Sequence, residues 1–159
     1  MGNETVKTDT AILEQLNEPD AIKILVTLDE QGTPHPTPKG SLHWDGERIV
    51  SWEILESSRT NRNLTRAIWF EKPIAILLLT SKKQAYKIAA KPIRNVVAGK
   101  EFTRYYEEAQ QRRGRAIAGV WFFEPTGITD QTPATRIAQE QKAHPYFVHL
   151  DQLAAKEPQ

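Results

Sequence analysis

The chain has 159 residues, 39% hydrophobic and 26% charged, the composition of a globular protein that can bury its own core without disulfides or metals. Its 21 basic and 20 acidic side chains nearly cancel, so neither a nucleic acid nor a membrane surface is an expected partner. It contains no cysteine, which excludes thiol nucleophiles, thiolate metal sites and dithiol redox chemistry. A redox function would therefore need a bound cofactor.

We expect no export signal in the N-terminal segment. Residues 1–8 are polar and lack the basic-then-apolar pattern of a secretion signal, and no apolar run reaches the length of a membrane span. We expect a cytoplasmic protein with one domain over residues 1–159, whose core covers about residues 20–127. A polar N-terminal segment and a C-terminal tail flank this core, with a short helix around residues 151–155.

The first part of the chain predicts a short helix, an inner strand and an edge segment. Asp9 is placed to cap a helix that Pro19 ends. Residues 22–28 are rich in branched side chains and predict a strand. Residues 34–44 contain three prolines, which cannot donate to a β ladder, so this segment is expected at an edge or a bulge.

A hairpin is predicted where Asp45 and Gly46 occur together. Both central residues of a type I′ turn need positive φ, and Asp-Gly is a favoured pair for that turn. Residues 47–54 are the strand expected after the turn, paired with the extended residues 34–44 before it.

The second half predicts three strands and a long helix. Residues 74–79 are continuously apolar, as in a strand buried on both faces, and residues 84–93 follow as its antiparallel partner. Residues 100–113 have apolar side chains at helical spacing, and Gly114 fits a left-handed cap at the end of that helix. Residues 116–124 predict the last strand.

A polar helix start lies within residues 57–64. Hydroxyls, a guanidinium and free backbone N–H groups at a helix start make a natural phosphate receptor, with Arg59, Thr60 and Asn63 as its candidate core. The alternative is that Ser58 or Thr60 only caps the helix and the arginines form a solvated basic face. Spacing alone leaves both interpretations open.

Other charged residues have a structural interpretation. Arg112, Arg113 and Arg115 lie at the end of the predicted long helix, where positive charge meets the helix dipole and needs no ligand. The four histidines have no close metal-ligand spacing, so no metal site is expected.

The order of these features resembles the pyridoxamine phosphate oxidase-related split-barrel flavoproteins. The similarity covers roughly residues 22–125 and rests on residues 28–35, Asp45-Gly46, residues 59–64 and residues 86–91. The resemblance implies an α+β fold, a mainly antiparallel six-stranded split β-barrel with flanking helices.

The resemblance also implies a flavin-ring wall. In this family a strand that corresponds to residues 37–42 runs along the ring, which places the cofactor at Thr37, Pro38, Lys39 and Gly40. Gly40 would permit the ring to approach closely, and the amine of Lys39 would stabilise negative charge on reduced flavin. The alternative is an ordinary edge strand.

The family's phosphate contacts come from the loop and helix start after the third strand. They correspond here to Ser58, Arg59, Thr60 and Asn63, which agrees with the phosphate receptor predicted from the residues themselves. Trp121 is a further candidate beside the flavin, although an aromatic residue in a last strand is also typical of plain core.

The activity implied is that of an FMN-dependent oxidoreductase, a homodimer with the flavin at the interface and a small-molecule substrate or electron donor that the sequence does not name. Thr60 stands where the vitamin oxidases place a lysine, which argues against pyridoxamine phosphate oxidation itself. The alternatives are a non-catalytic flavin carrier or sensor, a split barrel that binds deazaflavin or haem, and a dimeric scaffold with an empty groove.

Overall fold

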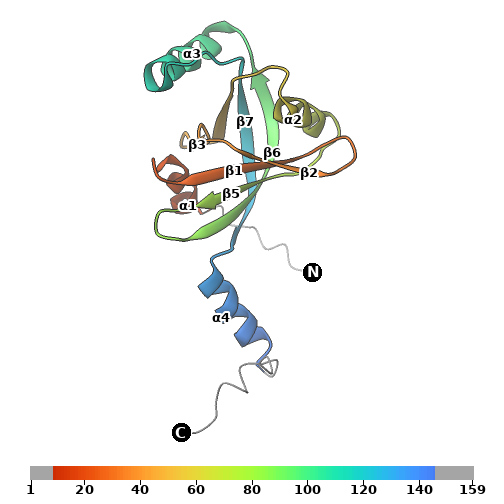
Figure 1. The fold of residues 1–159 in the computed structure, drawn as a ribbon, viewed down its shortest axis with the longest axis vertical. Coiled ribbons are helices and arrows are strands. Elements are labelled where there is room, and N and C mark those ends of the chain that lie inside the picture. The colour runs from red at the N-terminus through yellow and green to blue at the C-terminus, as the bar shows by residue number, and fades with distance from the viewer. Residues whose placement is uncertain (1–8, 146–159) are drawn as a thin grey trace.

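The computed structural model describes residues 9–145 (Figure 1). In chain order the elements are α1 (Thr10–Glu14), η1 (Gln15–Asn17), β1 (Ile22–Leu28), β2 (Pro34–Pro38), β3 (His43–Trp44), β4 (Ile49–Glu53), α2 (Arg59–Trp69), β5 (Ile74–Leu79), β6 (Ala85–Val96), α3 (Gly99–Arg113), β7 (Gly119–Asp130) and α4 (Pro133–Ala143). The short helix predicted around residues 151–155 lies outside the described residues.

The seven strands form one antiparallel sheet in the order β2-β1-β5-β6-β7-β4-β3. β2 and β3 are therefore the two edges of the sheet, yet only residues 39–42 separate them in sequence. Four residues span at most about 14 Å when fully extended, so the two edges must meet and the sheet must curl. We call residues 39–42 the closure segment.

This topology confirms the predicted α+β fold, a mainly antiparallel split barrel. The barrel has seven strands and not six, because the segment predicted as one extended strand, residues 34–44, divides at the closure segment. Its first part, β2, pairs with β1, and only the two residues of β3 pair with β4. The hairpin predicted between residues 34–44 and 47–54 is thus limited to β3 and β4.

The turn between β3 and β4 is shifted by one residue from the type I′ prediction, which was wrong in detail. The amide of Asp45 donates to the carbonyl of Arg48 at 3.1 Å, so Gly46 and Glu47 are the central residues. Gly46 has a φ of +103°, whereas Asp45 has no positive φ. The Asp45 carboxylate accepts the amides of Glu47 and Arg48 at 2.8 and 2.7 Å, which stabilises the turn without the type I′ backbone.

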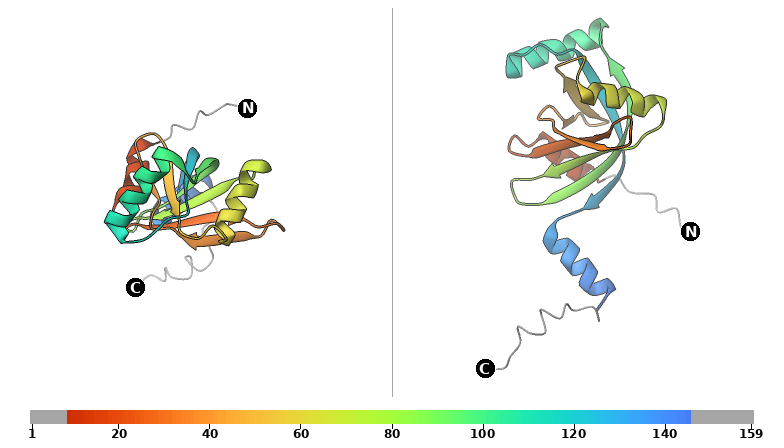
Figure 2. Two further views of the ribbon diagram at one scale, coloured as in Figure 1. Left: turned by 90° about the horizontal axis from the view of Figure 1, so that it is seen from above. Right: turned by 45° about the vertical axis from the view of Figure 1, so that its right-hand side comes forward.

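The core has two parts, separated by β7. Trp121 and Phe123 belong to the cluster inside the barrel, whereas Val120 and Phe122 belong to a second cluster that includes α3 residues. Alternate strand residues face opposite sides, so this continuously apolar run is buried on both faces. α3 accordingly lies across one end of the barrel, and α4 projects from the opposite end (Figures 1 and 2).

The last two long strands extend further than the sequence predicts. β6 runs to Val96 and β7 to Asp130, where ends near residues 93 and 124 were expected. Register shifts between Ala89 and Ala90 and between Pro92 and Arg94 carry the pairing past prolines that would otherwise end it. The helix over residues 100–113 is confirmed as α3, with Gly114 at φ +60° as its left-handed cap. Within residues 9–145, no helix has the length and apolarity to cross a membrane.

Candidate functional site

The start of α2 leaves donors available to a ligand. Ser58 is the N-cap, and its Oγ accepts the amide of Asn61 at 3.0 Å. The first amides of a helix have no intrahelical acceptor, and within residues 9–145 those of Arg59 and Thr60 have none elsewhere. The Arg59 side chain is exposed and has no ion-pair partner in the same part of the chain. An anion could therefore be held here by two amides and a guanidinium.

Replacing Ser58 with alanine should lower the free energy of unfolding by about 1 kcal/mol, because the amide of Asn61 loses its acceptor. Urea denaturation measures this. The Ser58→Asn variant is the matched control, since asparagine is an equally good N-cap and should keep the stability within a few tenths of a kcal/mol. An equal loss of stability in both variants would show that Ser58 does not stabilise the protein through the N-cap.

Thr60 and Asn63 face the barrel. They are only 3% and 4% exposed. The Thr60 Oγ1 lies 3.3 Å from the Oγ1 of Thr37, which in turn lies 3.0 Å from the Nε2 of His35. The Nδ2 of Asn63 donates to the Oγ1 of Thr27 at 3.0 Å. The structure therefore brings the predicted ring wall and the predicted phosphate helix together at Thr37 and Thr60, and it gives Asn63 a structural contact with β1.

Lys39, in the closure segment, forms a largely buried ion pair. Its Nζ lies 2.7 Å from the Oε2 of Glu53, and the two side chains are 13% and 6% exposed. The Lys39 amine, predicted to stabilise negative charge on reduced flavin, therefore already has a carboxylate partner that the local sequence does not signal. A ligand beside Lys39 meets a pair whose net charge is zero.

Gly40 contacts the end of α3. The Nη2 of Arg113 donates to the carbonyl of Gly40 at 2.8 Å, and a Cβ on Gly40 would lie 3.1 Å from the Nη1 of Arg113. The space that a side chain would fill at Gly40 is thus taken by the end of the Arg113 side chain in this structure. The helix-end interpretation of Arg113 missed this contact with a residue 73 positions earlier.

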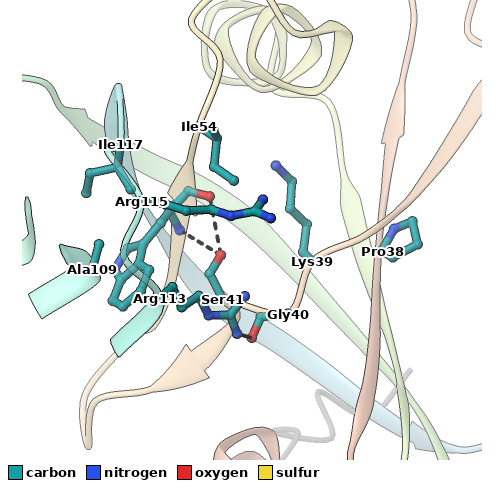
Figure 3. Close-up of a pocket in the computed structure, with 10 residues that line it drawn as sticks. Pro38, Lys39, Gly40, Ser41, Ile54, Ala109, Arg113, Arg115 and Ile117 are labelled. Carbon is teal, nitrogen blue, oxygen red and sulfur yellow. Dashed lines mark hydrogen bonds between the residues drawn. The ribbon is translucent and has the colours of Figure 1, made fainter. Parts of the chain in front are cut away.

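A hollow of about 470 Å³, which we call the α3 hollow, lies between the closure segment, β4 and the end of α3 (Figure 3). It is lined by Pro38, Lys39, Gly40, Ser41, Trp52, Ile54, Ala109, Arg113, Arg115 and Ile117. Its size is within the range of small-molecule sites, and its lining is part apolar and part polar, with Lys39, Arg113 and Arg115 as the charged residues. Three of the four predicted ring-wall residues line it, whereas Thr37 and the α2 residues do not.

Ser41 fixes the closure segment against the floor of the α3 hollow. The backbone amide of Trp52 donates to the Ser41 Oγ at 3.0 Å, and that hydroxyl donates to the Trp52 carbonyl at 3.2 Å (Figure 3). These reciprocal bonds hold the closure segment beside β4, so the position of Lys39 and Gly40 is set by the barrel and not by a free loop.

Trp121, the remaining candidate, lies inside the barrel. It is 2% exposed, and its Nε1 donates to the Oδ1 of Asn61 at 2.8 Å. This bond connects β7 with the first turn of α2. The indole therefore supports the start of α2 from within the core.

The comparisons with known proteins support the fold. No protein family model and no curated protein matches the sequence. Among solved structures, HupZ from Group A Streptococcus is 18% identical with a TM-score of 0.63, and the match covers 78% of this chain and 94% of that one. An FMN-binding protein from Syntrophomonas wolfei subsp. wolfei is 16% identical with a TM-score of 0.62, covering 77% of this chain and 88% of that one. An F420 reductase is 16% identical with a TM-score of 0.57, covering 77% and 97%.

The chain therefore has the split-barrel fold shared with flavin-type cofactor proteins, as its resemblance to that group predicted. At these identities the likeness establishes the fold and leaves the ligand to be argued from the site.

Proposed function

We propose that this protein binds FMN and acts as an FMN-dependent oxidoreductase. The observation that carries the proposal is the contact between β2 and the start of α2, where the Oγ1 of Thr37 lies 3.3 Å from the Oγ1 of Thr60. The next residue after Thr37, Pro38, is the first residue in the wall of the α3 hollow. The proposed phosphate receptor and a hollow of mixed apolar and polar lining thus adjoin along one short stretch of chain. The similarity in fold to a protein named as FMN-binding supports the same cofactor class.

The donor set fits a phosphorylated flavin. The amides of Arg59 and Thr60 and the guanidinium of Arg59 would hold the phosphate, while Pro38 and Ile54 offer apolar surface to the ring. When bound, FMN supplies the hydride chemistry, and the side chains of this protein bind it, orient it and exclude water. The ion pair of Lys39 and Glu53, whose charges cancel, would hold the Lys39 side chain in place at the polar side of the hollow.

We place a second protomer over the same region. Ile54 and Leu55, between β4 and α2, are 48% and 63% exposed, and adjacent exposed apolar residues are typical of interaction surfaces. A symmetric partner here would cover this patch and close the flavin site from outside, giving a homodimer with two equivalent sites.

The Arg59→Ala variant tests the phosphate anchor. It should weaken FMN binding by about 1.5–3 kcal/mol, the usual contribution of a charge-assisted hydrogen bond, and leave riboflavin binding nearly unchanged. The measurement is a titration of the visible flavin spectrum with each ligand. Arg62→Ala is the matched control, because Arg62 is exposed on the same helix beyond the first two amides.

Each outcome of that titration has a distinct meaning. Equal losses for FMN and riboflavin in Arg59→Ala would remove Arg59 from the site while leaving the cofactor proposal intact. A wild-type protein that binds neither flavin would sink the oxidoreductase proposal. If a deazaflavin or haem binds selectively in parallel titrations, that compound and not FMN is the cofactor of this protein.

A further inference from the structure

A second hollow, of about 500 Å³, adjoins the closure segment and includes the end of η1 in its wall. We call it the Lys23 hollow, after the β1 lysine that lines it. It shares Gly40, Ser41, Trp52 and Arg113 with the α3 hollow. Its remaining walls come from η1 and the two residues after it, from β1 and β3, from Leu42 of the closure segment and from Arg112 at the end of α3. Its lining includes neither the residues assigned above to the flavin phosphate nor the ion-paired Lys39 and Glu53.

Lys23 is a half-buried cation, and one of its three ammonium N–H donors has no acceptor in the described part of the chain. Its Nζ donates to the carbonyl of Leu16 at 3.0 Å and to the carbonyl of Leu42 at 2.7 Å. An ammonium has three N–H donors, so one is left over. Within residues 9–145 no carboxylate lies within ion-pair distance of this ammonium.

The contrast with Lys39 is informative. Lys39 is also removed from solvent, and there the chain provides a buried carboxylate at 2.7 Å, whereas Lys23 has only neutral carbonyl partners. Burying a charge without a counter-ion is unfavourable. The pKa of Lys23 is accordingly lowered, first by desolvation and then by the positive charge of Arg113.

Arg113 adds a second cation to the same hollow. Its hydrogen bond to the Gly40 carbonyl leaves its charge unbalanced. Arg112, also in the wall, is paired with Glu108 at 3.0 Å, and Glu18 is the one carboxylate among the lining residues. Lys23 and Arg113 together exceed the single charge of Glu18, so the hollow is positive.

We propose that the Lys23 hollow binds the oxyanion group, carboxylate or phosphate, of a small molecule, with Lys23 and Arg113 as its charge partners. The free N–H of Lys23 and the Arg113 guanidinium supply the donors, and the accessible apolar surfaces of Pro19 and Trp44 accommodate the rest of the ligand. An anion between the two cations replaces their mutual repulsion with attraction to both. The two hollows share four wall residues, but the charge partners proposed here differ from the groups assigned to the flavin, so this proposal does not depend on the flavin site.

The direct test is an NMR titration of the lysine side chains in the labelled full chain, with inorganic phosphate and with benzoate as probes. The Lys23→Arg variant assigns the Lys23 signal. Anion binding should raise the Lys23 pKa by about one unit, because an opposite charge favours the ammonium. Lys82, which is exposed, is the internal control and should not shift.

The two probes distinguish the oxyanion class. A saturable shift with phosphate alone assigns a phosphate group, a shift with benzoate alone assigns a carboxylate, and shifts with both support the shared oxyanion. Absence of a saturable shift with either probe, or equal shifts at Lys23 and Lys82, would overturn the proposal. The titration itself uses the wild-type protein, and the Lys23→Arg variant serves only to assign the signal.

Calorimetry separates this site from the flavin site. Lys23→Met should weaken binding of the responding probe at least about tenfold, the effect of losing a charge-assisted bond, whereas Lys82→Met should not. FMN affinity should be the same in both variants. If Lys23→Met binds the probe as tightly as wild type, the site lies elsewhere, whatever the flavin titration shows.

Discussion

Replacing Glu53 with glutamine is expected to lower the free energy of unfolding by about 3–5 kcal/mol, the usual cost of removing one partner of a buried ion pair. Glu53 is 4% exposed, and its Oε2 is 2.7 Å from the Lys39 ammonium. Glutamine has nearly the same shape but no charge, so the ammonium would stay largely buried without a counter-ion. Urea denaturation followed by circular dichroism measures the loss.

Two comparisons identify the cause of that loss. The exposed pair of Lys91 and Glu124, at 3.5 Å, provides the matched control, and Glu124→Gln should change stability by at most about 1 kcal/mol. Adding Lys39→Met to Glu53→Gln removes the unpaired charge and should restore much of the stability. If Glu53→Gln costs no more than Glu124→Gln, the pair does not hold the closure segment in place.

Features set by local chemistry could be predicted from the sequence. The spacing of apolar residues in α3 and the glycine after it depend only on neighbours within a few turns, and both are confirmed. The N-cap at Ser58 is equally local, because a hydroxyl accepts an amide three residues on. The fold class followed from the order of such elements.

Contacts that depend on barrel closure could not be predicted. Lys39 and Glu53 are 14 residues apart, and Gly40 and Arg113 are 73 apart. Each pair meets only because residues 39–42 join the two edges of the sheet. A lysine, a glutamate and a helix-end arginine are ordinary surface residues in a sequence, so nothing in their local pattern signals these contacts.

The sequence predicted which segments form the candidate site, but it did not predict how the charges in the site are paired. The polar start of α2 and the segment from Pro38 to Gly40 were identified because their residue types differ from their surroundings. The neutralisation of Lys39, and the occupation of the space above Gly40 by Arg113, required the tertiary structure. The site residues therefore lie about where the sequence predicts them, but the charges that a ligand would contact there differ from the prediction.

Replacing Trp121 with alanine is expected to lower the free energy of unfolding by about 3–5 kcal/mol, the usual cost of removing a large aromatic side chain from a core. Trp121 is 2% exposed and belongs to the cluster inside the barrel. Trp69→Ala is the matched control, because Trp69 is 78% exposed at the end of α2 and its loss should change stability by no more than about 0.5 kcal/mol. Similar losses in both variants would contradict the core assignment.

The Trp121→Phe variant separates the core role of this residue from a role beside the flavin. Phenylalanine keeps most of the aromatic packing but removes the indole donor to Asn61, so about 0.5–1.5 kcal/mol of stability should be lost. If Trp121 acts only through the core, FMN and riboflavin should bind this variant with equal, small changes in affinity and unchanged visible bands. A ring in contact with the indole would instead show a shifted flavin spectrum in Trp121→Phe. Because the indole lies inside the barrel, on the opposite face of β7 from the cluster that contains Trp52 in the α3 hollow, we expect the unchanged spectrum.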